Sequence, residues 1–476
     1  MTQLKIKTPN NTNVLLDDHV LKNFRQHMQG EVLQDGDSGY QDARTIWNGM
    51  IDKHPAAIAR CTGTADVLHA VRFAHHHNLL LSVRGGGHNV AGNALCDNGL
   101  TIDLSSMKGI HVDPASRTAR VQPGVCIGEL DHETQVFGLA NPNGIVSLTG
   151  IAGLTLGGGF GWLSRKHGLT CDNLLSADVV TAKGEFLTAS ETENADLFWG
   201  LRGGGGNFGI ATSFEYQLYP VGPEVMGGKI IYPFEKADEV LRFYRDFAAA
   251  APDELSTLAF LKKAPASPMI PDVFHGKLVV GVAVCYAGSI EDGQRVIQPL
   301  KEFETPIVDG ISPKPYTVIQ SMFDAGQQPG NHYYWKSEYL SGLSDEAIAT
   351  SINYAQKITS PMTGILIFQL GGAISRVDEE VMAASHRDAA FVLNINTAWK
   401  ESEENQRHIQ WTRDFWQAIR SQSTGGVYVN FLSQDEGRDR VRAAYGQATY
   451  DRLVELKDKY DPTNLFRVNQ NIQPTV

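Results

Sequence analysis

Cysteine is scarce in this sequence of 476 residues, and its five cysteines are scattered at Cys61, Cys96, Cys126, Cys171 and Cys285. None of them forms a CxxC pair, and an odd number cannot all be paired within one chain. We therefore expect free, mostly buried thiols of a reducing compartment, without a disulfide framework. The pattern also predicts no metal site.

Long apolar runs and an excess of positive charge are absent as well. No run approaches the roughly 20 residues that cross a bilayer, and MTQLKIKTPNNTNVLLDD at the N-terminus has no apolar core like that of a signal peptide. Lysine and arginine number 41 against 53 aspartates and glutamates, a formal charge of −12. This balance argues against nucleic-acid or anionic-membrane partners. We expect a cytoplasmic protein that binds neither.

Glycine, in contrast, is abundant, with 47 residues where about 7% of a chain is typical. The excess lies in three clusters, 85–87, 157–161 and 203–209, all in the first half of the chain. The second half alternates apolar strands with polar helices, and YPVGPEVMGG near residue 220 has the composition of a linker. A chain of this length exceeds one ordinary core, so we expect at least two domains with a boundary there.

The first cluster follows a predicted helix and strand. Thr64 is expected to cap a helix with one apolar face, and the strand Leu79–Val83 then runs into RGGGH at 84–88. A glycine loop at the end of a strand offers unhindered N–H groups to an anionic ligand. The histidine triplet at 75–77 closes the helix, and its side chains diverge too far to share a metal ion.

Two common phosphate-binding motifs are excluded. The Gly-Lys pairs at 228–229 and 276–277 are not followed by Ser or Thr, as a Walker A loop requires. Gly204, Gly206 and Gly209 have GxGxxG spacing, but IATSFEYQLYPV after them alternates like a strand where a Rossmann motif needs a helix.

The longer motifs carry a family resemblance. RGGGHN is followed by TGIAGLTLGGGFGWLSRKHGLTCDN at 149–173, DLFWGLRGGGGNFGI at 196–210, YVNFL at 428–432 and KYDPTNLFRVNQNI at 459–472. In this order and spacing, the motifs closely resemble FAD-linked oxidases of the berberine bridge enzyme-like family, within the vanillyl-alcohol oxidase / p-cresol methylhydroxylase (PCMH) superfamily. The resemblance runs from about residue 50 to the end and is weakest in 221–425.

The resemblance implies an α+β fold in which a two-part PCMH-type FAD-binding domain carries an inserted substrate domain. The FAD-binding part would comprise 1–220, with its core at about 53–220, and the returning C-terminal segment 428–476. The substrate domain, 221–427, would be a large antiparallel sheet backed by helices. Independently, 277–288 and 364–377 have strand patterns, and Ser289 is placed to cap a helix over 289–303.

The resemblance also implies FAD as the cofactor, held covalently by His88 through the 8α-methyl carbon of the flavin. A neutral imidazole is a competent nucleophile for such a bond. Many relatives add a cysteinyl tether, but Val146 stands at that position, so we expect a single covalent bond and take Cys171 as a packing residue. The remaining residues expected to bind the cofactor are Arg84, Gly85, Gly86, Gly87, Asn89, Gly92, Thr149, Gly150, Gly153, Gly157, Gly158, Gly159, Trp162, His167, Gly168, Asp172, Asn173, Gly206, Asn207, Gly209, Ile210 and Asn469.

The resemblance points to Tyr428 and Asn430 of the Y-x-N motif as catalytic residues. On a strand the two side chains would share one face, with Tyr428 as the base that takes a proton from the substrate. Because a tyrosine with a pKa of about 10 is a poor base at neutral pH, a nearby cation is expected. The candidates, left undecided, are Lys336, Arg376 and His386.

Thr149 bears on the electron acceptor. In the family a valine-sized residue at this position tends to admit oxygen, and threonine has nearly that shape. We therefore expect an oxidase that takes hydride from an alcohol, a sugar, or a natural-product hydroxyl or amine and forms H2O2, with the small-molecule substrate and O2 as its partners. The alternatives are a dehydrogenase with another acceptor and a flavin-carrying protein without turnover. The oligomeric state is not readable from the sequence.

Overall fold

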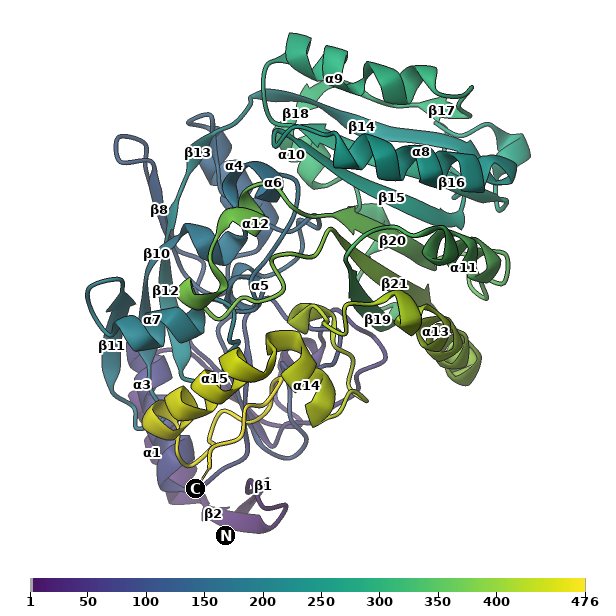
Figure 1. The fold of residues 1–476 in the computed structure, drawn as a ribbon. Helices are drawn as coiled ribbons and strands as arrows, with labels where there is room; N and C mark the ends of the chain where they lie inside the picture. Colours follow the sequence, from purple (N-terminus) through teal and green to yellow (C-terminus); the bar gives the residue numbers. More distant parts are fainter. Residues whose placement is uncertain (1–2, 476) are drawn as a thin grey trace.

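A computed structural model describes residues 3–475, which form two β-rich bodies packed against each other (Figure 1). The first body holds a four-stranded sheet, β3-β4-β6-β5, in which β4, β6 and β5 are parallel, and a five-stranded antiparallel sheet, β11-β10-β12-β8-β7. The strands are β3 Val32–Leu33, β4 Ala57–Arg60, β5 Leu81–Arg84, β6 Leu100–Asp103, β7 Ile110–Asp113, β8 Thr118–Val121, β10 Leu174–Val180, β11 Phe186–Ser190 and β12 Ile210–Gln217.

Smaller elements complete the first body. Two short antiparallel pairs are β1 with β2 and β9 with β13. Their bounds, with those of the helices, are β1 Gln3–Lys7, β2 Asn13–Asp17, β9 Leu139–Ala140, β13 Tyr219–Pro220, α1 Asp18–His27, α2 Tyr40–Arg44, α3 Thr64–His76, α4 Ile127–Gln135, α5 Ile151–Leu156, α6 Ser164–His167 and α7 Ala195–Leu201. Both chain ends lie on this body (Figure 1).

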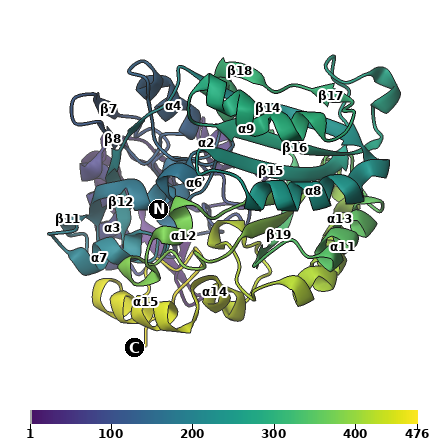
Figure 2. The same cartoon turned by 45° about the horizontal axis from the view of Figure 1, so that its top comes forward.

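The second body is one eight-stranded antiparallel sheet with four long helices on its outer face (Figure 2). Its order is β17-β14-β16-β15-β20-β21-β19, with β18 also paired to β14. The strands are β14 Glu224–Pro233, β15 Leu255–Lys263, β16 Leu278–Tyr286, β17 Val308–Asp309, β18 Ser312–Pro315, β19 His332–Leu340, β20 Gly364–Gln369 and β21 Phe391–Trp399. The four covering helices are α8 Ala237–Ala249, α9 Ile290–Glu302, α11 Asp345–Ala355 and α13 Asn405–Ile419.

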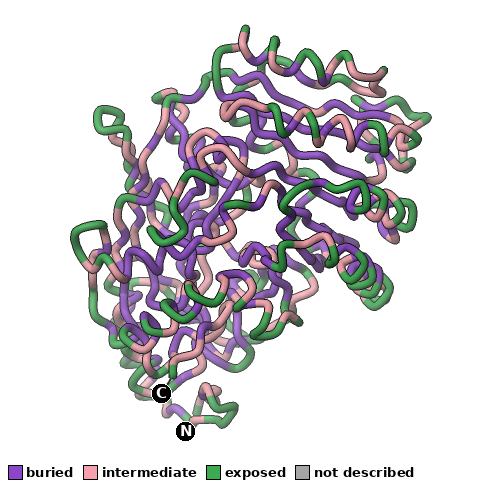
Figure 3. The backbone as a smooth tube through the Cα atoms, in the orientation of Figure 1, coloured by how far each residue is buried: buried purple, intermediate pink, exposed green. Residues whose placement is uncertain are grey.

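The strands of this sheet are apolar on both faces because both are covered (Figure 3). Along β16, Val280 and Val282 pack under the outer helices, whereas Val279 and Ala283 pack toward the first body. After α13 the chain returns to the first body through α14 Arg438–Tyr445 and α15 Gln447–Tyr460, and α15 packs on α7. The two remaining short helices are α10 Tyr316–Gln320 and α12 Ala373–Arg376.

The predicted α+β fold with a helix-backed antiparallel sheet is confirmed. The strand in 277–288 is present as β16, and the Ser289 side chain accepts a hydrogen bond from the Asp292 backbone, as a helix cap does. The strand predicted over 364–377 is wrong in its second half, because β20 ends at Gln369 and 373–376 is helical. Helix α3 begins at Thr64 itself, with Gly63 at the cap and no side-chain cap bond.

All five cysteines are free, and four of them are buried. No group of three or more histidine, cysteine, aspartate or glutamate side chains within 3–475 could hold a metal ion. No helix in the same range combines the length and the apolarity that a membrane crossing requires.

Candidate active site

A cavity of about 300 Å³ lies between the two bodies. All three glycine clusters reach it from the first body, the large sheet forms the opposite wall, and two pieces of the C-terminal segment, 428–431 and 468–470, close it. Of the residues expected to bind the cofactor, those that line the cavity are Gly85, Gly86, Gly87, His88, Asn89, Thr149, Gly150, Gly153, Gly157, Gly206, Asn207, Gly209, Ile210 and Asn469. Tyr428 and Asn430 line it as well.

His88 enters the cavity directly after β5, beyond the left-handed residue Gly87 with φ of +70°. Its ring stacks on Trp47, with centroids 4.0 Å apart, and Trp47 stacks in turn on Tyr333 at 3.7 Å. Burial lowers the pKa of His88 to about 4, so the imidazole is neutral at physiological pH. Its Nε2 atom is buried and has no hydrogen-bond partner among residues 3–475.

The glycines that line the cavity differ in what surrounds them. A Cβ on Gly86 would lie 2.5 Å from the Cα of Gly150, so these two loops touch backbone to backbone. Around Gly153 and Gly206, by contrast, a Cβ would meet nothing within 4 Å. These two glycines leave open space against the cavity, which is the room that a ligand packed on the backbone needs. Together with the unpartnered His88 nitrogen, this open cradle fits FAD.

Tyr428 and Asn430 are brought together by a turn. The strand predicted for the Y-x-N motif is wrong, because Val429–Phe431 is a single 3₁₀ turn and Tyr428 precedes it in extended conformation. The turn places the Nδ2 of Asn430 2.9 Å from the hydroxyl of Tyr428, to which it donates a hydrogen bond. The Gly159 N–H also donates to this hydroxyl, at 3.0 Å, and Asn430 donates to the Leu154 carbonyl at 3.2 Å.

The electrostatics around Tyr428 differ from the expectation. Burial raises the pKa of Tyr428 well above its usual value, although the hydrogen bonds from Asn430 and Gly159 act in the opposite direction. Within the described chain, none of the three candidate cations bonds to its hydroxyl. Arg376 pairs with an aspartate near the surface, and Lys336 is held by two carboxylates. His386 lines a cavity of about 30 Å³ behind Tyr428, and its Nε2 lies 2.7 Å from a backbone carbonyl oxygen.

The sheet side of the cavity has a polar wall of uncharged groups. Gln327, Asn394 and Asn396 line it, and the Gln327 amide donates to the Asn396 oxygen at 3.3 Å. The buried Nε1 of Trp335, Oε1 of Gln327 and Oδ1 of Asn394 have no partner within residues 3–475. No aspartate, glutamate, lysine or arginine belongs to the lining in the described structure. The wall can therefore donate to and accept from a neutral ligand without adding formal charge.

Sequence reasoning missed this wall and Trp47. FVLNINTAW did hold a signal, since Asn394 and Asn396 stand two apart in an apolar strand and must share a face. No such signal marks Gln327, which lines the cavity, or Trp47, which stacks on His88, because tertiary packing alone places both.

Nine residues expected to bind the cofactor do not line the cavity: Arg84, Gly92, Gly158, Gly159, Trp162, His167, Gly168, Asp172 and Asn173. Gly158 and Gly159 instead contact Tyr428: a Cβ on Gly158 would lie 3.7 Å from its ring, and Gly159 bonds to its hydroxyl. Part of the second glycine cluster is thus explained by packing against the C-terminal motif.

The other seven residues have structural roles: five contact other residues, and two are glycines with a left-handed backbone. The Asp172 carboxylate is bound by both terminal nitrogens of the buried Arg387, at 2.7 and 3.0 Å, and the ring of His167 stacks on Tyr219 at 3.8 Å. Arg84 donates to the Ala43 carbonyl, Asn173 donates to two backbone carbonyls, and the ring of Trp162 stacks near that of Phe323. Gly92 and Gly168 both have positive φ values, +71° and +84°, which a side chain would disfavour.

Comparison with known proteins places these observations in one family. A family model described as FAD binding domain matches residues 55–190, and one described as Berberine and berberine like matches 427–473. The chain is 32% identical to an FAD-linked oxidoreductase of Dictyostelium discoideum, covering 96% of this chain and 97% of the relative. It is 31% identical to (R)-6-hydroxynicotine oxidase of Paenarthrobacter nicotinovorans, covering 94% and 97%.

A solved structure agrees with the sequence relatives. The fold matches the crystal structure of 6-hydroxy-D-nicotine oxidase from Arthrobacter nicotinovorans with a TM-score of 0.85 and 29% identity. The match covers 94% of this chain and 98% of that one, so both bodies and the returning C-terminal segment are included.

Proposed function

The chain belongs to the berberine bridge enzyme-like family of FAD-linked oxidoreductases, and on that premise we propose that it is an oxidase of neutral, hydroxyl-bearing small molecules. The observation that carries the proposal is the cavity itself, where the open glycine cradle and His88 face Tyr428, Asn430 and an uncharged amide wall. In this proposal residues 1–220 and 428–476 hold the cofactor and 221–427 select the substrate.

His88 is the residue that would hold FAD covalently. Its neutral imidazole keeps a lone pair for bond formation, and stacking on Trp47 fixes the plane of the ring. Val146 lines the same cavity and offers no nucleophilic atom, so one bond is expected. When bound, FAD would accept hydride from the substrate and pass the electrons to O2.

Tyr428 and Asn430 would bind and orient the reacting hydroxyl. The Tyr428 oxygen already accepts two hydrogen bonds, so its own proton is free to be donated to a ligand oxygen. Because burial raises the pKa of Tyr428, its ground state is the neutral phenol, and orientation is the role that this geometry supports directly. Action as a base would require the bound substrate to lower that pKa.

The amide wall supports an uncharged substrate. A cationic amine would leave its charge without a carboxylate partner in the cavity, which is costly away from water. Hydroxyl groups both donate and accept, and so match the unpartnered Trp335 N–H and the Gln327 and Asn394 oxygens. Alcohols, sugars and hydroxylated natural products meet this requirement.

The test is a substrate panel with the purified enzyme. Alcohols, neutral sugars and amines are mixed with it anaerobically, loss of flavin colour is followed, and air is then admitted while H2O2 is measured. Hydroxyl compounds should bleach the flavin, and air should restore the colour with formation of peroxide. Reduction without reoxidation in air would indicate a dehydrogenase, and failure of the whole panel would favour a flavin carrier without turnover.

Two variants assign the residues. Tyr428→Phe should keep the flavin and slow its reduction, by about 100-fold or more if Tyr428 is the base and by about 10-fold if it only orients the substrate. Tyr450→Phe, which removes a hydroxyl outside the cavity, is the matched control. After denaturation and digestion, mass spectrometry should find flavin only on the peptide that contains His88.

A further inference from the structure

The segment that carries the Y-x-N motif runs along the free edge of β19, the last strand of the large sheet. The Thr424 N–H donates to the Tyr339 carbonyl at 2.9 Å, and the Tyr339 N–H donates to Gly426 at 3.2 Å. Ser433 meets the same edge, since its hydroxyl donates to the Trp335 carbonyl at 2.6 Å and accepts from the Trp335 N–H at 3.1 Å. The edge is therefore occupied by residues on both sides of the catalytic motif.

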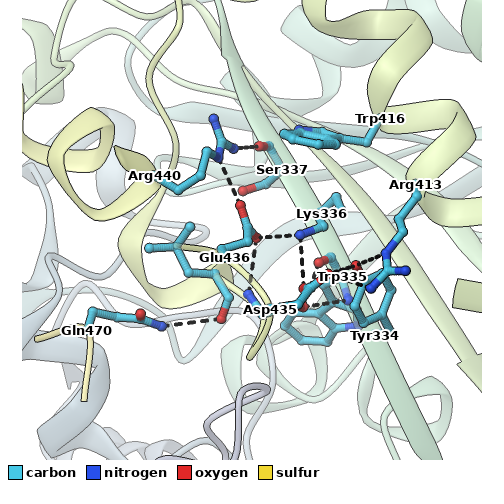
Figure 4. A network of polar contacts seen from close by, with 12 residues as sticks. Tyr334, Trp335, Lys336, Ser337, Arg413, Trp416, Asp435, Glu436, Arg440 and Gln470 are labelled. Atoms are coloured by element: carbon cyan, nitrogen blue, oxygen red, sulfur yellow. Dashed lines mark hydrogen bonds and ion pairs between the residues drawn. The ribbon is translucent and has the colours of Figure 1, made fainter. Parts of the chain in front are cut away.

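Shortly after Ser433, ion pairs hold the segment to the face of β19 that points away from the cavity (Figure 4). The Nζ of Lys336, whose side chain is 3% exposed, lies 3.1 Å from Asp435 and 3.3 Å from Glu436. Arg413 pairs with Asp435 at 2.7 Å, and Arg440 pairs with Glu436 at 2.8 Å. We call these five residues the β19 ion cluster.

Strand geometry links this cluster to the cavity. Trp335 and Lys336 are consecutive in β19, so their side chains leave opposite faces, the first into the cavity and the second into the cluster. Asp435 is five positions after Asn430, and Ser433, between them, is fixed to the strand. The catalytic turn and the cluster are thus two ends of one short, doubly anchored segment.

The cluster is costly to open. Lys336 and Glu436 are almost fully buried, so separating them would remove an ion pair from two charges that are shielded from water. Glu436 also accepts a hydrogen bond from the Ser433 N–H at 3.2 Å, so the carboxylate that binds Lys336 fixes the backbone nearer the motif as well.

We propose that Lys336 is a positioning residue, which anchors 433–436 on β19 and thereby fixes Tyr428 and Asn430 in the cavity. The proposal rests on the function proposed above for those two side chains. Lys336, considered from sequence as a cation beside Tyr428, would act through the backbone and not through its own electric field on the phenol.

The test compares Lys336→Met holoenzyme with the wild type by hydrogen exchange and by anaerobic flavin reduction. Amides of 424–440 should exchange about 10-fold faster or more, while those of the remaining sheet keep their protection. The rate constant of reduction should fall about 10- to 100-fold and KM should change less than about 3-fold, because geometry is lost and the substrate wall is kept. Arg295→Gln, which breaks an exposed ion pair of α9, is the control that should change neither.

A charge-matched double variant separates anchoring from general stability. Lys336→Met/Glu436→Gln removes both charges of one pair and should recover part of the Tm lost in Lys336→Met, while exchange in 424–440 stays as fast as in Lys336→Met, because the anchor on β19 is still missing. Wild-type exchange in 424–440 of Lys336→Met, or acceleration spread evenly over the chain, would overturn the proposal. If Lys336→Met does not fold, Asp435→Asn receives the same measurement and the same criteria.

The anchoring role of Lys336 and the catalytic roles of Tyr428 and Asn430 can fail separately. If Tyr428→Phe and Asn430→Ala both reduce the flavin at wild-type rates, the catalytic roles fail. Exchange in 424–440 then still decides whether Lys336 anchors the segment.

Discussion

At the scale of single residues, burial changes the chemistry of His88 strongly. Its pKa of about 4 results from burial, since stacking on Trp47 and enclosure by the glycine loops remove water from the ring. Imidazole in water has a pKa of about 6.5 and is half protonated at that pH. The folded pKa is therefore the lower one, so any stability linked to His88 is present at high pH and is lost as the pH falls from about 6.5 to about 4.

This shift predicts the pH dependence of flavin attachment. Apo-protein incubated with FAD should gain acid-precipitable flavin at a nearly constant rate from pH 8 to about pH 5, with a fall toward pH 4, because only the neutral imidazole is nucleophilic. Trp47→Ala should expose the ring and move the fall toward pH 6.5. A wild-type midpoint already near 6.5 would contradict the burial that the structure assigns to this ring.

The reaction of the reduced flavin with oxygen is proposed to depend partly on the size of the side chain at Thr149. It lines the cavity beside Gly150, where an added methyl group would take space from a small molecule. Thr149→Ile should remain folded and yellow and be reduced normally. Its reoxidation in air should be slower by about 10-fold or more. Thr149→Val, which keeps the shape, should reoxidise like the wild type. Equal reoxidation of all three would mean that oxygen reaches the flavin by another route.

At the scale of elements, glycines that let two loops touch can be distinguished from glycines that leave space for the cofactor. Gly86→Ala would force a Cβ against the Gly150 backbone and should lower the free energy of unfolding by about 1–3 kcal/mol. Gly153→Ala meets no protein atom within 4 Å, so the apo-protein should keep its Tm while FAD binding weakens. Thermal unfolding with and without FAD distinguishes the two. A Gly86→Ala variant of unchanged Tm would show that the loops can separate freely.

The elements also show what sequence could and could not predict. Period-two and period-3.6 patterns identified β16, β12 and α9, because burial along each element repeats with the period of that element. The turn at Val429–Phe431 was not predicted, since its YVNF alternation is that of a strand and the bonds to the distant Gly159 and Leu154 cannot be read from a local pattern. The motifs predicted the loops around the cavity well. The amide wall joins Asn394 and Asn396 of one strand, β21, to Gln327 of a distant loop, and it left only the Asn394 and Asn396 alternation as a signal.

At the scale of the whole molecule, two buried arginines fasten one body to the other. Arg165 of α6 donates to the carbonyl of Leu255 in β15 and to that of Leu370, directly after β20. In the reverse direction, Arg387 reaches from the second body to Asp172 of the first. These contacts hold the two walls of the cavity at a fixed separation, which a reaction between a bound cofactor and a bound substrate requires.

The Arg387–Asp172 pair gives the sharpest test, because the motif resemblance implies that Asp172 binds the cofactor. In the structure its side chain is 7% exposed and that of Arg387 is 2% exposed, so Asp172→Asn would leave a buried guanidinium without its counter-charge. Breaking such a pair costs about 3–5 kcal/mol, and the Tm of the apo-protein should fall accordingly. Well below that Tm, the variant should keep its flavin on His88, since Asp172 does not line the cavity. An apo-protein of wild-type Tm that no longer retains FAD would support the cofactor role expected for Asp172 and would show that this pair does not connect the bodies.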